Sequence, residues 1–180
     1  TDGRHFRHLT ILVREGAEAH VIESHLASGG FSNVVIEYVL EPGAVLHRSV
    51  YQDGAPEAVQ AATATVRLGR GARLEQCALG FGSLLSRIET RIWHDAGESQ
   101  AQLDGAYIAS SGRHIDFTSE VRHAAPDCAT TQTAKGAAYA GGRGVFQGKF
   151  HVARDAQHTD AQMEHHALLL EEGAEVDAKP

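Results

Sequence analysis

A histidine and a cysteine that could together bind a metal ion stand close in the sequence. His123 and Cys128 lie on either side of a turn that contains Pro126. A thiolate and an imidazole placed across a turn can both bind iron or zinc. Two ligands do not complete a metal site, and a single cysteine is commonly a small buried apolar residue. We therefore take His123 and Cys128 as candidate metal ligands and leave the identity of any metal open.

The other histidines add no recognisable metal-binding pattern. The chain has 12 histidines in all. The neighbours His165 and His166 would point to opposite faces of a strand, so they could not share one ion. His20, His25 and His47 could line one face, but their spacing matches no structural zinc motif. We expect these histidines at the surface or in ladders of stacked side chains.

Motifs of the common enzyme classes are missing from the sequence. It contains no CxxC, HExxH or Walker-type phosphate-binding sequence, and no H-x-H pair of the kind that cupins use. The glycine-rich run 141–144 lies between two strand-like segments, so the helix N-terminus that would bind phosphate is lacking. Charged residues alternate over 114–122, as in the groove of a carbohydrate-active β-helix, although this pattern is typical of a solvated sheet face.

We accordingly expect a protein that is not an enzyme, with no catalytic residues and no firmly bound cofactor. A β-helix carbohydrate-active enzyme and a histidine-rich metal-binding β protein remain as alternatives. A bound sugar would favour the first, and a metal assay on anaerobically purified protein would separate the two.

Composition and charge narrow the class of protein. The 180 residues include 16 Lys and Arg against 23 Asp and Glu, a net charge of −7, which argues against nonspecific nucleic-acid binding. No apolar run reaches the roughly 18 residues of a membrane-spanning helix, and no signal peptide is visible. The two cysteines, of which Cys77 is expected at the surface, do not suggest a disulfide framework. We expect a cytoplasmic protein that binds neither nucleic acid nor membrane.

The elements that must position the candidate residues recur at a near-constant interval. Gly16, Gly43, Gly71 and Gly97 mark successive turns, and the spacing between neighbours in this series is almost the same each time. Two alternating runs fill each interval. Examples of the residues that share one face are Val34-Ile36-Tyr38-Leu40, Ala44-Leu46-Arg48-Val50 and Leu84-Ser86-Ile88-Thr90-Ile92.

A fixed period with two strands per period is characteristic of a solenoid. The predicted fold is all-β: a right-handed parallel β-helix with about six coils of about 28 residues and two strands per coil. Helix and strand both remain open for residues 161–172, where the alternation favours a strand. We expect residues 1–180 to form one β-helix core domain. Because the chain lacks an initiator methionine and stops directly after a strand-like segment, we also expect it to be a fragment of a longer protein.

The last third of the chain carries an ordered set of short motifs. GRGVFQGKF, AQHTDAQM, LLL and AEVDAKP follow one another between residues 142 and 180, and HAAPDCATTQTAKG lies just upstream. This order resembles the SufB/SufD family of scaffold proteins in SUF iron–sulfur cluster assembly, and most closely SufD. We interpret the motif residues as structural: the glycines give room for stacked side chains, and the polar residues form hydrogen-bond ladders or cap a turn. These residues are Gly144, Phe146, Gly148, Gln157, Thr159, Asp160 and Gln162.

The resemblance implies a non-catalytic subunit that acts with a SufB-like scaffold and a SufC-like ATPase. The β-helices of the two scaffold subunits would pair edge to edge, and an iron–sulfur cluster would form near their interface. The SufD-side histidine implicated there belongs to a Cys-x-His stretch beyond the AEVDAKP motif, so no cluster ligand is assigned to this chain. FADH2 binding and the partner-facing side stay open. Because terminal coils expose unpaired backbone, a homodimer through an end or edge of the β-helix is also expected.

Overall fold

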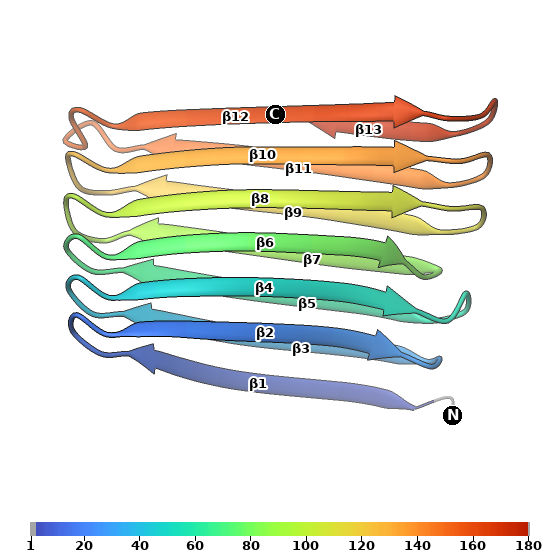
Figure 1. Cartoon of the computed structure of the whole chain (residues 1–180), viewed down its shortest axis with the longest axis horizontal. Helices are drawn as coiled ribbons and strands as arrows, with labels where there is room; N and C mark the ends of the chain where they lie inside the picture. Colours follow the sequence, from blue (N-terminus) through green and yellow to red (C-terminus); the bar gives the residue numbers. More distant parts are fainter. Residues whose placement is uncertain (1–2, 180) are drawn as a thin grey trace.

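The computed structural model describes residues 3–179, and within that range all regular structure is β-strand (Figure 1). The strands are β1 (Arg4–Val13), β2 (Glu18–Ala27), β3 (Phe31–Leu40), β4 (Val45–Gly54), β5 (Val59–Leu68), β6 (Arg73–Gly82), β7 (Leu85–His94), β8 (Gln100–Ala109), β9 (His114–His123), β10 (Ala129–Ala138), β11 (Arg143–Val152), β12 (Asp160–Leu169) and β13 (Glu175–Lys179). The described residues include no helix long and apolar enough to cross a membrane. Most of 161–172 lies in β12, so the helical alternative was wrong. Pro180, which closes the AEVDAKP motif, lies outside the described residues.

The strands form two parallel sheets that face each other. Odd-numbered strands make a seven-stranded sheet in chain order from β1 to β13, and even-numbered strands make a six-stranded sheet from β2 to β12. In Figure 1 the even strands run to the right in front, the odd strands return to the left behind them, and the chain rises coil by coil. This winding is right-handed, as expected for parallel crossovers. The predicted parallel β-helix with two strands per coil is confirmed.

The turns repeat because each one bonds to the turn of the next coil. Gly16 N donates to Pro42 O at 3.0 Å, and Gly43 N donates to Arg70 O at 2.8 Å. Gly16 and Gly43 have φ of 64° and 68°, a left-handed conformation that favours glycine. In later coils Glu98, Asp127 and His158 take this conformation, with φ of 57–65°. The near-constant interval therefore reflects one turn geometry repeated along the same edge of the solenoid.

Alternate residues of each strand fill the narrow interior between the two sheets. Ile36, Tyr38 and Leu40 of β3 are buried, and so are Leu46 and the other inward residues predicted for β4. The strand period of two thus assigned the inward face correctly. Leu84 was assigned to that face wrongly. Its side chain is 53% exposed, because β7 begins only at Leu85 and residue 84 still belongs to the connection.

The interior opens to solvent at both ends of the described stack. Leu9 of β1 faces inward beside Ile36 but is 52% exposed, and Leu169 of β12, level with the buried Ala138, is 60% exposed. No further coil covers these two positions within residues 3–179. The end coils therefore present apolar interior side chains together with unpaired strand edges.

Candidate functional site

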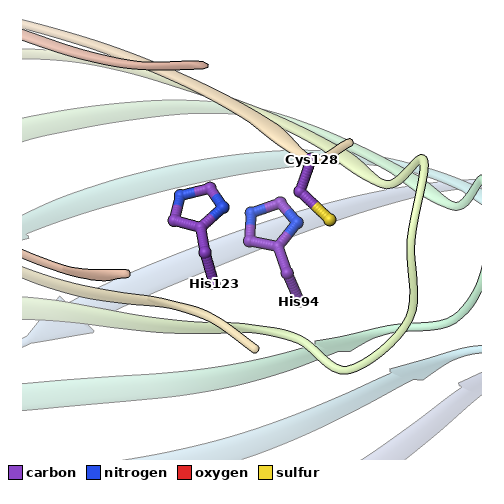
Figure 2. A group of neighbouring side chains, drawn as sticks. All are labelled: His94, His123 and Cys128. Atoms are coloured by element: carbon purple, nitrogen blue, oxygen red, sulfur yellow. The ribbon is translucent and has the colours of Figure 1, made fainter. Parts of the chain in front are cut away.

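Several groups of buried polar side chains interrupt the apolar interior, and two of them contain buried ionisable residues. The first, which we call the His–Cys cluster, consists of His94, Ser99, His123, Cys128 and Thr130. Figure 2 shows its two histidines and its cysteine. Each of these five residues is at most 1% exposed. Polar groups buried in this way are expected to find hydrogen-bond partners inside the protein. The group lies where β7 and β9 end and the turns to β8 and β10 begin.

Coil stacking brings His94 and His123 together. They are the last residues of β7 and β9, and they occupy adjacent positions in the register of that sheet. Their imidazole rings stack with centroids 4.3 Å apart and 9° between the planes. Cys128 comes from the turn before β10, and Figure 2 shows its sulfur pointing towards the His94 ring. Phe150 of the next coil meets His123 edge-on, with ring centroids 6.3 Å apart.

A chain of hydrogen bonds connects the two imidazoles. Thr130 Oγ1 lies 2.9 Å from His94 Nε2 and 3.3 Å from His123 Nε2. Nδ1 of His94 lies 2.7 Å from Ser99 Oγ, which donates to Ala96 O at 3.0 Å. Nδ1 of His123 is buried and has no partner. We therefore place the proton of His123 on Nε2, because an N–H at Nδ1 would have no acceptor.

This proton position sets the donor and the acceptor of each hydrogen bond that connects His123, Thr130, His94 and Ser99. His123 Nε2 donates to Thr130, the Thr130 hydroxyl donates to His94 Nε2, and His94 Nδ1 donates to Ser99. Cys128 Sγ lies 3.3 Å from Ser99 Oγ and donates its proton to Pro126 O at 3.4 Å. The cluster thus has one unsatisfied acceptor, the lone pair on His123 Nδ1.

Both imidazoles are neutral in this environment. Burial lowers the pKa of His94 to about 3, and the neighbouring His123 acts in the same direction. Burial also lowers the pKa of His123 below its usual value. A neutral imidazole keeps one nitrogen lone pair, which is the form that binds a metal ion.

The arrangement brings together the two candidate ligands from the sequence and adds a third. One ligand atom from each of His94, His123 and Cys128 lies within 4.8 Å of the others. Sequence reasoning paired His123 with Cys128 across their turn but missed His94. The available signal was spacing: His123 follows His94 by close to one coil, so both belong to the same inward row.

The second group is an ionic network near the start of the stack. Arg48 donates to both carboxylate oxygens of Glu23 and also to Gln76, and Tyr38 donates to Glu23 as well. The side chains of Arg48 and Glu23 are 1% and 5% exposed. Burial raises the pKa of Glu23, but hydrogen bonds from His25 and Arg48 and the charge of Arg48 outweigh it and lower the pKa to about 2. The pair is therefore ionised and fully engaged within the protein.

The histidines of β2 do not share one face. His20 and His47 point outward, stack at 4.4 Å and both approach Glu18, at 3.1 and 3.3 Å. His25 points inward and lies 3.0 Å from Glu23. The three histidines therefore do not line one face, because an odd separation along the strand places His20 and His25 on opposite sides.

The motif residues of β11 pack against aromatic rings and a thioether. Gly144 lies against the Tyr107 ring, and a Cβ atom at residue 144 would overlap it. Phe146 stacks on His165 with centroids 4.7 Å apart, and Gly148 lies against the end of the Met163 side chain.

The polar motif residues make local contacts within one turn and the start of β12. Gln157 donates to Arg154 O at 2.6 Å, and Thr159 donates to Ala156 O at 2.9 Å. The side chains of Asp160 and Gln162 lie 3.4 Å from each other at the surface. These contacts correspond to the turn-capping interpretation and not to ladders that run between coils.

The remaining candidates lie at the surface. Cys77 is exposed on the outer face of β6. In the charged row of β9, Asp116 approaches Arg87 at 3.6 Å and Arg122 donates to Glu120 at 2.8 Å. Both carboxylates are paired with guanidinium groups. This arrangement is typical of ion pairs on an outward sheet face and differs from that of two catalytic acids.

Comparison with known proteins gives consistent matches along the whole chain. A sequence model described as "SUF system FeS cluster assembly, SufBD core domain" matches residues 1–180. An iron–sulfur cluster assembly SufBD family protein of Mycobacterium bovis is 27% identical over 97% of this chain and 46% of its own length. The chloroplastic protein ABCI7 of Arabidopsis thaliana is 27% identical, over 94% of this chain and 37% of its own. SufB of Bacillus subtilis is 23% identical, over 97% and 38%. The chain spans less than half the length of these relatives.

Proposed function

Because this chain belongs to the SufBD family of SUF-system iron–sulfur cluster assembly proteins, we propose that it acts as a SufD-like scaffold subunit beside a SufB-like scaffold and a SufC-like ATPase. In this role it catalyses no reaction itself, and the iron–sulfur cluster is the cargo of the complex. The ATPase supplies the energy for conformational change. We propose that the complex works in the cytoplasm, with neither nucleic acid nor membrane as a partner.

The match of the family across all of residues 1–180 carries this proposal. The finer SufD-like assignment is supported by the ordered motifs GRGVFQGKF, AQHTDAQM and AEVDAKP at residues 142–180.

Co-purification of the full-length protein with its own partners tests the proposal. The protein carries an affinity tag and is expressed with the SufB-like and SufC-like proteins of the same organism. We expect all three to elute as one complex, and anaerobic reconstitution with iron and sulfide to load a cluster only when the SufB-like subunit is present. A protein that elutes alone, or that loads a cluster without the SufB-like subunit, contradicts the SufD-like role.

A further inference from the structure

We propose that His94, His123 and Cys128 bind a single borderline divalent metal ion, Zn²⁺ or an ion with the same ligand preferences, inside the stack of coils. The proposal goes beyond the scaffold role, which requires no ion in the interior of this subunit. It stands on the geometry of the His–Cys cluster and does not depend on which partners the subunit binds. If the three-protein complex described above does not form, the metal-site proposal is unaffected.

The donor set suits such an ion. One thiolate and two neutral imidazoles are ligands that zinc and ferrous ions accept, and three protein ligands leave a fourth position for water or a hydroxyl group. The ligand atoms lie within 4.8 Å of one another. Ligands of a tetrahedral zinc ion are about 3.4–3.6 Å apart, as follows from bond lengths of about 2.0–2.3 Å. For the site to close, the ligand atoms must therefore approach one another by up to about 1 Å.

An ion would supply a partner for the one buried acceptor of the cluster that has none. Nδ1 of His123 is buried without a partner, which costs free energy that a ligand could recover. The parallel rings of His94 and His123 cannot both aim a lone pair at one ion, so one ring must turn out of the stack. His94 then gives up the hydrogen bond between its Nε2 and Thr130 in exchange for a coordinate bond. Ser99 on Nδ1 of His94 and Thr130 on Nε2 of His123 remain as hydrogen-bond partners that orient the two ligands.

An ion can reach the cluster from the turn edge of the solenoid. His94 and His123 are the final residues of their strands, and Cys128 lies in a turn. Local opening at a strand end breaks fewer hydrogen bonds than opening in the middle of a sheet. On binding, the S–H bond of Cys128 breaks, its proton passes to solvent and a sulfur–metal bond forms, so no oxidant or reductant is involved.

Cobalt titration of the full-length, metal-free protein under anaerobic reducing conditions tests the proposal. We expect one Co²⁺ per chain, a thiolate-to-cobalt charge-transfer band and visible bands of tetrahedral cobalt, all displaced by one equivalent of Zn²⁺. C128S removes the charge-transfer band. Because loss of a supporting residue already costs about 10–100-fold in metal affinity, H94Q is expected to weaken Zn²⁺ binding at least about 100-fold.

C77S is the matched control, because Cys77 is the other free cysteine and is exposed. It should bind Co²⁺ and Zn²⁺ as the unmodified protein does. H20Q controls for the surface group of Glu18, His20 and His47, which contains no sulfur. If C128S or H94Q fails to fold, X-ray absorption of the zinc-loaded unmodified protein still decides the matter: one sulfur at about 2.3 Å supports the site. No charge-transfer band, a band that survives in C128S, or zinc bound only by nitrogen and oxygen would overturn it.

Discussion

His94 and His123 stack face to face in the interior, 4.3 Å apart, and share the hydroxyl of Thr130. The pair shows how a parallel β-helix turns a sequence interval of one coil into a side-chain contact. Each imidazole is neutral and buried, so the stability of the pair depends on hydrogen bonds and not on charge. The Thr130 hydroxyl is the hydrogen-bond partner of Nε2 in both rings.

Replacement of Thr130 by valine should destabilise the protein strongly for so small a change. T130V keeps the shape but leaves the Nε2 atoms of His94 and His123 without their partner. A buried polar group that loses its partner costs about 1–3 kcal/mol. We expect the free energy of unfolding, measured by chemical denaturation, to fall by about 2–3 kcal/mol. T131V, at the exposed neighbouring position, should change it by less than about 0.5 kcal/mol. Equal values for the two variants would contradict the bridging role.

Acidification should lower the free energy of unfolding because Glu23 becomes protonated. Its folded pKa of about 2 lies below the ordinary value of 4.5. A lowered carboxyl pKa contributes stability that is complete above pH 4.5 and is lost as the pH falls towards 2, on the order of 3 kcal/mol. E23Q should therefore show a shallower decline of unfolding free energy across this window, although it is less stable at neutral pH because Arg48 loses its charged partner.

E37Q provides the matched control for the acid experiment. Glu37 is an exposed carboxylate on β3 whose contact is a distant His8, 3.7 Å away. Its removal should leave the decline between pH 4.5 and 2 as steep as in the unmodified protein. If E23Q and E37Q gave parallel curves, Glu23 would not be the group that carries this pH dependence.

Two glycines of the same strand should differ in their tolerance of alanine. In G144A the new methyl group would overlap the Tyr107 ring, whose hydroxyl lies 3.0 Å from His165 Nε2 and holds the ring in place. In G148A the methyl would meet the thioether end of Met163, which can rotate away. We expect G144A to lower the unfolding free energy by about 1–3 kcal/mol and G148A by less. The reverse order in denaturant titrations would refute the packing argument.

The uncovered final coil should make a polypeptide of these 180 residues self-associate. Leu169 belongs to the inward row of β12 and is 60% exposed, whereas its neighbour Leu168 is 65% exposed on the outer face. An end-to-end dimer would bury the inward row of the final coil. A lysine in that row would place a charge inside the dimer interface and oppose association. Sedimentation at high concentration should show association for the unmodified chain and for L168K, and mainly monomer for L169K. A clean monomer for the unmodified chain would refute the prediction.

The overall fold could be predicted because its determinants are local. Gly16 and Gly43 adopt a left-handed turn that other residues disfavour, and the period of two in β3 and β4 assigns buried and exposed faces. Leu84 was misplaced because it falls in the connection before β7, where the alternation has not yet begun. His25 was misplaced for a different reason: it lies an odd number of positions after His20, so the strand period itself puts the two on opposite faces.

The amino-acid sequence by itself determined the coil, its approximate length and its inward face, because turn geometry and strand alternation act between near neighbours. Only the tertiary structure decided which inward side chains meet. The interval between paired strands varies from coil to coil: Arg4 opposes Phe31 in the first coil, whereas Arg143 opposes Glu175 across a longer stretch of chain in the last. That register, set by turn length and by packing between coils, places His94 beside His123 and Cys128 and joins Glu23 to Arg48.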